Sequence, residues 1–244
     1  MTRVVAGWLG ERHSLVVEAG LVAGLYGLYE TGRGLVAGDP AVAVRHAQEV
    51  ASWERSLHVF VEGRVQDAAA TLPGLVGTLG VLYLTLHLAV TGGYLLWLHH
   101  RRPDAFPFVR TALLAASALA LVGYLAFPTA PPRMAGLGIA DTISRGGVDL
   151  NHGLVSSLYN PFAAVPSMHV CYASIVGGSL VRHGRRRVLG LVGCLYPLLV
   201  LLVIVATGNH FLVDAAAGAA VAGLGAALGR VSVPAVRLAA PADA

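Results

Sequence analysis

Long apolar runs separated by short polar turns dominate this chain. Five of them approach or exceed the roughly 20 residues that a helix needs to cross a bilayer: Leu72–Leu98, Thr111–Phe127, Phe162–Val181, Val188–Ala206 and Phe211–Gly229. The run Leu15–Ala37 is a weaker sixth, because it carries Glu18, Glu30 and Arg33. We count it since Glu30 and Arg33, three residues apart, can pair on one helix face. The pattern predicts an all-α fold, an integral membrane six-helix bundle.

The segment between the first two runs has a different pattern. From Pro40 to Thr71, charged residues alternate with apolar ones such as Val50, Trp53 and Phe60, which is typical of an amphipathic helix lying at the membrane interface. A solvated helical connector is the alternative. We therefore divide the chain into an N-terminal segment with the first span (1–38), an amphipathic interfacial helix (39–71), a five-span catalytic core (72–230) and a flexible tail (231–244).

Composition strengthens the membrane prediction and removes several classes of function. Only 12% of residues are charged, about half the share in soluble domains. All 17 basic residues are arginine, which excludes a lysine-based mechanism. The arginines lie beside apolar runs, as is typical of the cytoplasmic loops of membrane proteins. The basic pI therefore does not indicate a nucleic-acid partner. Cys171 and Cys194 fall inside apolar runs without metal-ligand spacing. Charged residues interrupt the first apolar stretch, so we expect no cleavable signal peptide.

Arginine placement predicts the topology. The loop from His99 to Arg110 holds three arginines and the loop from Arg182 to Arg187 holds four. Two spans separate these loops, so both lie on one side, the cytoplasm. Six spans then place both termini there as well. The loop from Pro128 to Asn160 and the turn before His210 face outside.

Two short motifs carry the candidate chemistry at this outer side. Pro-Ser-Met-His ends at His169, and His-Phe-Leu-Val-Asp runs from His210 to Asp214. Histidine is the side chain whose ordinary pKa suits proton transfer near neutrality. His210 and Asp214 are four residues apart, which places them on one face of a helix. A carboxylate that accepts one ring N–H leaves the other nitrogen free as base or nucleophile.

Residues near these motifs are suited to binding phosphate. Arg133, in the same outer loop, offers the fork-shaped guanidinium that phosphate oxygens prefer. Ser167 adds a hydroxyl group. Pro166 suits the first turn of a helix, whose free N–H groups favour an anion.

The two motifs, PSMH and GNHFLVD, resemble the second and third motifs of the type 2 phosphatidic acid phosphatase superfamily, over roughly residues 127–218. The branch with inositol phosphorylceramide synthases and bacterial relatives is the most similar. The resemblance implies a lipid-phosphate phosphatase or phosphotransferase without cofactor or metal. It assigns His210 as the nucleophile that becomes a phosphohistidine, Asp214 as its orienting partner and His169 as the general acid. The implied substrates are phospholipid, isoprenoid or sphingolipid phosphates.

The chain also departs from the family pattern. Leu95 stands where the first motif has lysine, and Arg102-Pro103 imitates only the end of that motif on the cytoplasmic side. Ile204 occupies the position of a usual arginine, and Met168 that of a common glycine. Fewer phosphate-binding cations favour the synthase-like branch over a simple phosphatase.

Other interpretations remain open at this stage. His169, His210 and Asp214 have the chemistry of a zinc site with an open position, although no His-Glu-x-x-His pattern accompanies them. A small transporter is a third class, without a visible inverted repeat. His87 lies in the second predicted span either as a cleft residue or as a core histidine. Asp149, Asn151 and His152, in the loop 141–152, are candidate headgroup contacts. Gly225 and Gly229, at small-xxx-small spacing, predict close helix packing.

Overall fold

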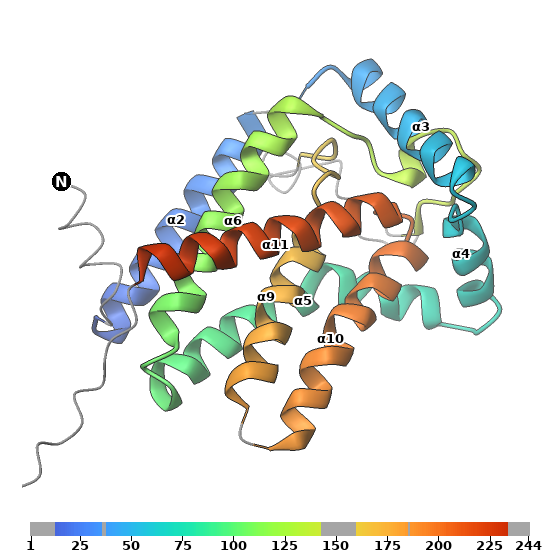
Figure 1. Ribbon diagram of the computed structural model, residues 1–244. Helices are drawn as coiled ribbons and strands as arrows, with labels where there is room; N and C mark the ends of the chain where they lie inside the picture. The colour runs from blue at the N-terminus through green and yellow to red at the C-terminus, as the bar shows by residue number, and fades with distance from the viewer. Residues whose placement is uncertain (1–12, 36–37, 143–159, 185, 234–244) are drawn as a thin grey trace, which may run out of the picture.

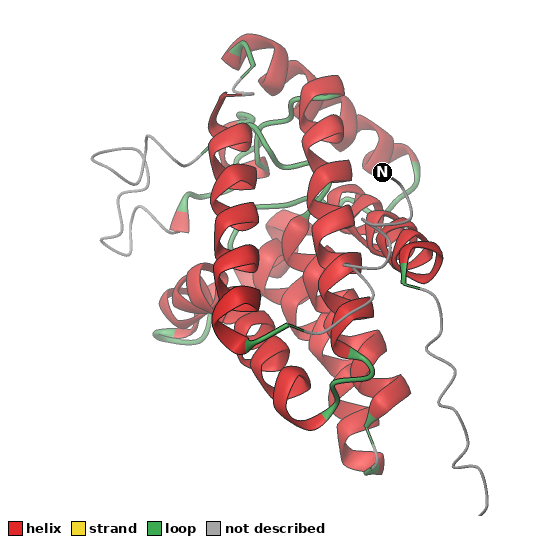
Figure 2. Cartoon of the chain, turned by 90° about the vertical axis from the view of Figure 1, so that its left-hand side faces the viewer, coloured by secondary structure: helices red, strands yellow, loops and turns green. Residues whose placement is uncertain are grey.

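The computed structural model describes residues 13–35, 38–142, 160–184 and 186–233. Regular structure in these ranges is helical (Figures 1 and 2). The helices are α2 (Leu15–Leu35), α3 (Pro40–Ser56), α4 (Glu62–Ala70), α5 (Leu75–Arg101), α6 (Phe106–Ala126), the 3-10 turn η1 (Pro132–Met134), α9 (Met168–His183), α10 (Arg187–Ala206) and α11 (Leu212–Ser232). The all-α prediction is confirmed for the part of the chain that the structure describes.

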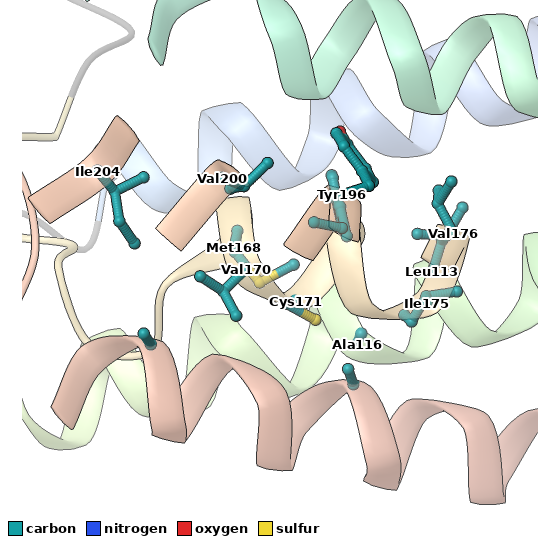
Figure 3. Close-up of a cluster of buried hydrophobic side chains, with 14 of the residues drawn as sticks. Leu113, Ala116, Met168, Val170, Cys171, Ile175, Val176, Tyr196, Val200 and Ile204 are labelled. Carbon is teal, nitrogen blue, oxygen red and sulfur yellow. The ribbon is translucent and has the colours of Figure 1, made fainter. Parts of the chain in front are cut away.

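Helix α9 is the centre of the bundle. It packs against α5, α6, α10 and α11, and α11 crosses over both α6 and α9 (Figure 1). The apolar core lies between α6, α9 and α10 and includes Leu113, Val176 and Val200, one from each helix (Figure 3). Glycine allows the closest crossing, because a Cβ on Gly177 of α9 would overlap the carbonyl oxygen of Gly193 in α10.

Small residues also bring α11 onto α6. A Cβ on Gly225 would lie 2.7 Å from the carbonyl oxygen of Ala112, and one on Gly229 would lie 3.2 Å from that of Phe108. Both distances are shorter than ordinary van der Waals contact. The packing role predicted for these two glycines is therefore confirmed.

Four of the described helices, α5, α6, α10 and α11, are long and apolar enough to cross a membrane. Helix α9 has only 16 residues, fewer than the 20 or so that a span needs. Helix α2 has the length but carries three charged side chains. Its Glu18 is buried and forms an ion pair of 2.6 Å with the buried Arg110 of α6. Pairing of this kind is what makes a buried charge tolerable.

The predicted interfacial segment folds as two helices. Helices α3 and α4 lie at the end of the bundle where α11 begins (Figure 1). The inner face of α3 is formed by small and branched residues, among them Ala43, Ala47 and Val50, and packs against Ala130 and Phe211. This segment therefore covers the loops of its own protein with one face.

The two arginine-rich turns meet at one end of the bundle. Arg102, in the α5–α6 turn, donates a hydrogen bond of 2.7 Å to the carbonyl oxygen of His183 at the end of α9. Arg102 also pairs with Asp104 at 3.1 Å, and this bond lowers the pKa of the Asp104 carboxyl. His169 lies 14 residues earlier on α9, about 21 Å away along the helix axis. Both arginine-rich turns are thus at the opposite end from the candidate site.

Candidate functional site

The two motif histidines face one cavity. It has a volume of about 220 Å³ and lies between α2, α5, α9 and the turn that precedes α11. Its lining includes three histidines, His87, His169 and His210, and several tyrosines, Tyr26, Tyr29, Tyr83, Tyr124 and Tyr172. The cavity has a polar end at the histidines, enclosed by aromatic and apolar side chains. A concave site of this kind is the usual form of a small-molecule or headgroup site.

His210 and Asp214 are in contact, as the sequence predicted. His210 Nδ1 lies 3.2 Å from Asp214 Oδ2. The carboxylate oxygen only accepts, so Nδ1 carries the hydrogen and Nε2 is left with a free lone pair. Asp214 is fully buried and His210 is 4% exposed. The pair has the geometry of an oriented nucleophile.

The contact arises from a helix cap and not from a shared helix face. Helix α11 begins at Leu212, so His210 precedes it. Asp214 lies in the first turn, and its Oδ2 also accepts a hydrogen bond of 2.9 Å from the Phe211 N–H. A carboxylate at this position stabilises the free N–H groups and dipole of a helix N-terminus. The same atom therefore caps the helix and orients the histidine.

His169 is the second residue of α9 and lies beside His210. The two ring centroids are 5.6 Å apart. His169 Nε2 donates to the carbonyl oxygen of Tyr83 at 3.1 Å, because a carbonyl only accepts. Its Nδ1 is then the nitrogen that can gain or lose a proton. The ring stacks on Tyr83 at 4.4 Å and touches His87 at 4.1 Å, so His87 belongs to the site and not to a separate core position.

Two buried glutamates hold the start of α11 from outside the bundle. Glu54 Oε1, on α3, accepts the Val213 N–H at 2.7 Å, and Glu62 Oε1, on α4, accepts the Leu212 N–H at 3.2 Å. Both glutamates are fully buried. Burial first, and then the hydrogen bond with Glu62, raises the pKa of Glu54 to about 8. These carboxyl groups fix the backbone that follows His210, a role the sequence pattern of alternating charges did not reveal.

The turn between α10 and α11 is fixed from the other side by Arg133. Its Nε donates to Asn209 Oδ1 at 3.0 Å, its backbone N–H donates to the Gly208 carbonyl at 3.0 Å, and its guanidinium lies 3.6 Å from Asp141. Gly208 has φ +69°, the left-handed region that favours glycine. Arg133 is not on the lining of the cavity. The structure thus places Arg133 behind this turn, bonded to Asn209, the residue before His210.

Ser167 also lies behind the site. It is fully buried and is not on the cavity lining. Its backbone N–H donates to the Asp214 carbonyl at 3.0 Å, and its hydroxyl has no hydrogen-bond partner among the described residues. Ser167 therefore joins the start of α9 to the start of α11, which brings the two histidines together.

Arg33 is the cation that the sequence did not assign to the site. It lines the cavity from α2, 3.3 Å from Glu30 and 3.4 Å from the carbonyl oxygen of Asn160. The predicted Glu30–Arg33 pair is confirmed. The only signal in the sequence was the three-residue spacing, which says nothing about proximity to His169, 136 positions later. Arg33 is the only arginine on the described lining.

The remaining candidate positions are elsewhere. Ile204, at the position of a usual family arginine, is fully buried in the core. Asp149, Asn151 and His152 lie outside the described residues. Within the described ranges, no three His, Cys, Asp or Glu side chains converge as a metal site.

The apolar helices are typical of a membrane protein, and His169 and His210, the latter paired with a buried carboxylate, share one cavity within it. The sequence profile of the PAP2 superfamily matches residues 48–228. The match covers most of the chain, and the protein therefore belongs to the PAP2 superfamily, whose members have phosphatase-type activity. No curated protein and no solved structure matches the chain.

Proposed function

We propose that the protein transfers a phosphoryl group from a membrane lipid phosphate to water or to an alcohol, through a phosphohistidine on His210. One observation carries this proposal: His210, oriented by Asp214, and His169 share a single cavity that also contains Arg33. A nucleophile, a proton donor and a phosphate-binding cation are the groups that such a transfer needs. Family membership supports the phosphatase half of the proposal.

The reaction follows from the hydrogen bonds. His210 Nε2 attacks phosphorus, and an N–P bond forms as the P–O bond to the lipid breaks. His169 gives its Nδ1 proton to the leaving oxygen. In the second half, His169 removes a proton from water or an alcohol, the oxygen attacks phosphorus, and the N–P bond breaks. Asp214 stabilises the positive charge on His210 while that bond forms.

Phosphate is held by Arg33 in this proposal. From the sequence alone, Arg133 is expected in this role, but Arg33 lines the cavity and Arg133 does not. A guanidinium can bind two phosphate oxygens at once. Arg133 then acts through the turn that it fixes before His210.

The membrane arrangement is part of the proposal. Helix α2 and the 20-residue segment Phe162–Val181, which contains most of α9, complete six spans with the four apolar helices, with both termini in the cytoplasm. The arginine-rich end is cytoplasmic, so the histidines face the extracytoplasmic side. Leu95 and Ile204 stand where the family usually has cations. This replacement supports a transferase related to inositol phosphorylceramide synthases over a simple phosphatase. Phospholipid, isoprenoid and sphingolipid phosphates are the candidate substrates.

The test is to trap the phosphohistidine. Purified protein is incubated briefly with radiolabelled lipid phosphate and quenched in alkali, where phosphohistidine survives. We expect label on the wild type, and His210→Ala should lose the label and on the order of 10³-fold or more of the turnover. His100→Ala, an exposed histidine at the far end of α5, is the matched control. Near-normal turnover by His210→Ala contradicts the mechanism.

The same preparation separates the two rival classes. Loss of turnover with EDTA and recovery with zinc would favour a metal-dependent hydrolase. Solute flux through proteoliposomes that persists in His210→Ala would favour a transporter. The product distinguishes transfer to water from transfer to an alcohol. Hydrolysis releases phosphate, whereas transfer produces a new phosphoryl lipid or polyol.

A further inference from the structure

Helix α2 forms one wall of the site although it lies outside residues 48–228, the region shared with the family. It supplies Tyr26, Tyr29, Glu30 and Arg33 to the cavity lining. The matched region of the family therefore does not include this wall.

Two further cavities continue from the site along α2. A cavity of about 140 Å³ shares Tyr26, Leu88 and Tyr172 with the catalytic cavity. A third, of about 160 Å³, shares Val22, Gly92 and Leu95 with the second. We call the second and third cavities together the α2–α5 groove, because each is lined by residues of both helices.

The surface of this groove is mainly hydrocarbon. Four of its polar side chains are bonded in pairs: Ser117 Oγ lies 2.7 Å from Tyr172 OH, and Arg110 is paired with Glu18. The Thr91 hydroxyl has no hydrogen-bond partner among the described residues. Aliphatic side chains from α2, α5 and α6 form the rest of the wall, including Val22, Leu95, Leu113 and Leu114. An occupant without polar groups is what such a wall accommodates.

The length and access of the groove fit one lipid chain. From Arg33, at the phosphate end, to Leu15, at the far end of the groove, α2 covers 18 residues, about 27 Å along its axis. The hydrocarbon layer of a bilayer is about 30 Å thick. Large apolar side chains at the rim are open to the surroundings, since Leu25 is 39% exposed, Leu88 43% and Leu96 48%. A chain can therefore pass between the groove and the bilayer.

We propose that the α2–α5 groove binds a long hydrocarbon chain of the substrate, whose phosphate lies between His169 and His210. The inference rests on the proposed phosphoryl transfer and names its substrate class: a lipid phosphate with a chain long enough to follow α2 from Arg33 past Val22. Helix α2 is then the specificity element of this chain, with Arg33 at the phosphate end and Val22 at the chain end.

Two neighbouring glycines allow a matched test. Gly92 lines both groove cavities, and a Cβ there meets nothing within 4 Å. Gly93 is equally open but lines none of the three cavities. Gly92→Leu therefore fills the groove, whereas Gly93→Leu adds the same side chain outside it. The probes are monoalkyl phosphates with chains of about 8 and about 18 carbons, in detergent micelles; the short chain does not reach the far cavity.

We expect the wild type and Gly93→Leu to prefer the longer chain by at least about tenfold in kcat/KM, the effect of two buried methylene groups. Gly92→Leu should lose most of this preference and keep its activity on the shorter chain. The proposal that the groove binds the chain is contradicted if Gly92→Leu and Gly93→Leu show equal chain preference. It is also contradicted if the wild type shows no preference for the longer chain. Failure of the wild type on both probes counts against the proposed function instead.

A binding measurement keeps the two questions separate. A photoactivatable 18-carbon alkyl phosphate, with the reactive group near the chain end, is crosslinked to the inactive His210→Ala protein. Adducts are expected on α2 and α5 at residues such as Val22 and Leu95, reduced at least about fivefold by Gly92→Leu but not by Gly93→Leu. Adducts confined to other helices overturn the groove whether or not turnover is observed.

Discussion

At the scale of single residues, the proposed nucleophile depends on groups remote in sequence. Asp214, in the first turn of α11, bonds His210, which precedes the helix. Glu54 and Glu62 bond the backbone that follows His210 from helices about 150 positions earlier. Buried carboxyl groups without cations are stable only when a proton or N–H groups satisfy them. Here the Leu212 and Val213 N–H groups fill that role.

The raised pKa of Glu54 gives a prediction for stability. In the unfolded chain a glutamate titrates near its ordinary value, about 4.3, whereas in the native protein the pKa of Glu54 is raised to about 8, by burial first. The native state therefore binds the extra proton between these values. Stability is full below the lower pKa and falls as pH rises toward 8, by up to about 1.4 kcal/mol per pH unit.

Thermal unfolding of the detergent-solubilised protein between pH 5 and about pH 9 measures this effect. The charged groups that face Glu54 are Glu62 on α4 and Asp214 on α11. Glu54→Gln should flatten the pH dependence, because the amide oxygen can still accept the Val213 N–H and the amide does not titrate. The exposed Glu49→Gln on the same helix is the control and should retain the slope. Identical slopes in the two variants would show that Glu54 does not carry the proton.

At the scale of helices, glycine positions decide how α11 packs. The sequence predicted this for Gly225 and Gly229, and the contacts with α6 confirm it. The spacing identified the positions but not the partner helix. Partner choice depends on how the chain crosses itself, which no local pattern contains.

Two glycines of α11 test this packing. Gly225→Ala places a Cβ 2.7 Å from the Ala112 carbonyl, whereas Gly223→Ala meets nothing within 4 Å. We expect Gly225→Ala to lower the free energy of unfolding by about 1–3 kcal/mol. Gly223→Ala should be neutral or stabilising by up to about 1 kcal/mol, through helix propensity. Unfolding in a denaturing detergent measures both, and equal stability of the two variants would contradict the close contact.

At the scale of the whole molecule, the candidate site and the arginine-rich turns lie at opposite ends of α9. This separation matches the topology inferred from arginine counts alone. If arginine is retained on the cytoplasmic side, as we propose, the site opens to the extracytoplasmic side.

Cysteine labelling tests the orientation in the membrane. Cys171 and Cys194 are replaced, and single cysteines are introduced as Met134→Cys at the site end or Asp104→Cys at the arginine-rich end, both at exposed side chains. An impermeant maleimide should label the first variant in intact cells and the second only after permeabilisation. The reverse pattern would place the site in the cytoplasm.

The sequence by itself determined the helical class, the packing glycines and the contact between His210 and Asp214. These depend on local periodicity, apolar length and short spacing, which act through neighbouring residues. Tertiary structure decided which cation shares the cavity, Arg33 in place of Arg133, and which carboxyl groups hold the start of α11. Tertiary structure also brings His169 and His210, from two separate motifs, into one cavity. Ser167 and Asp214 join the starts of α9 and α11 through a backbone hydrogen bond. Contacts of this kind join segments far apart in the chain, and only the packing of the helices determines them.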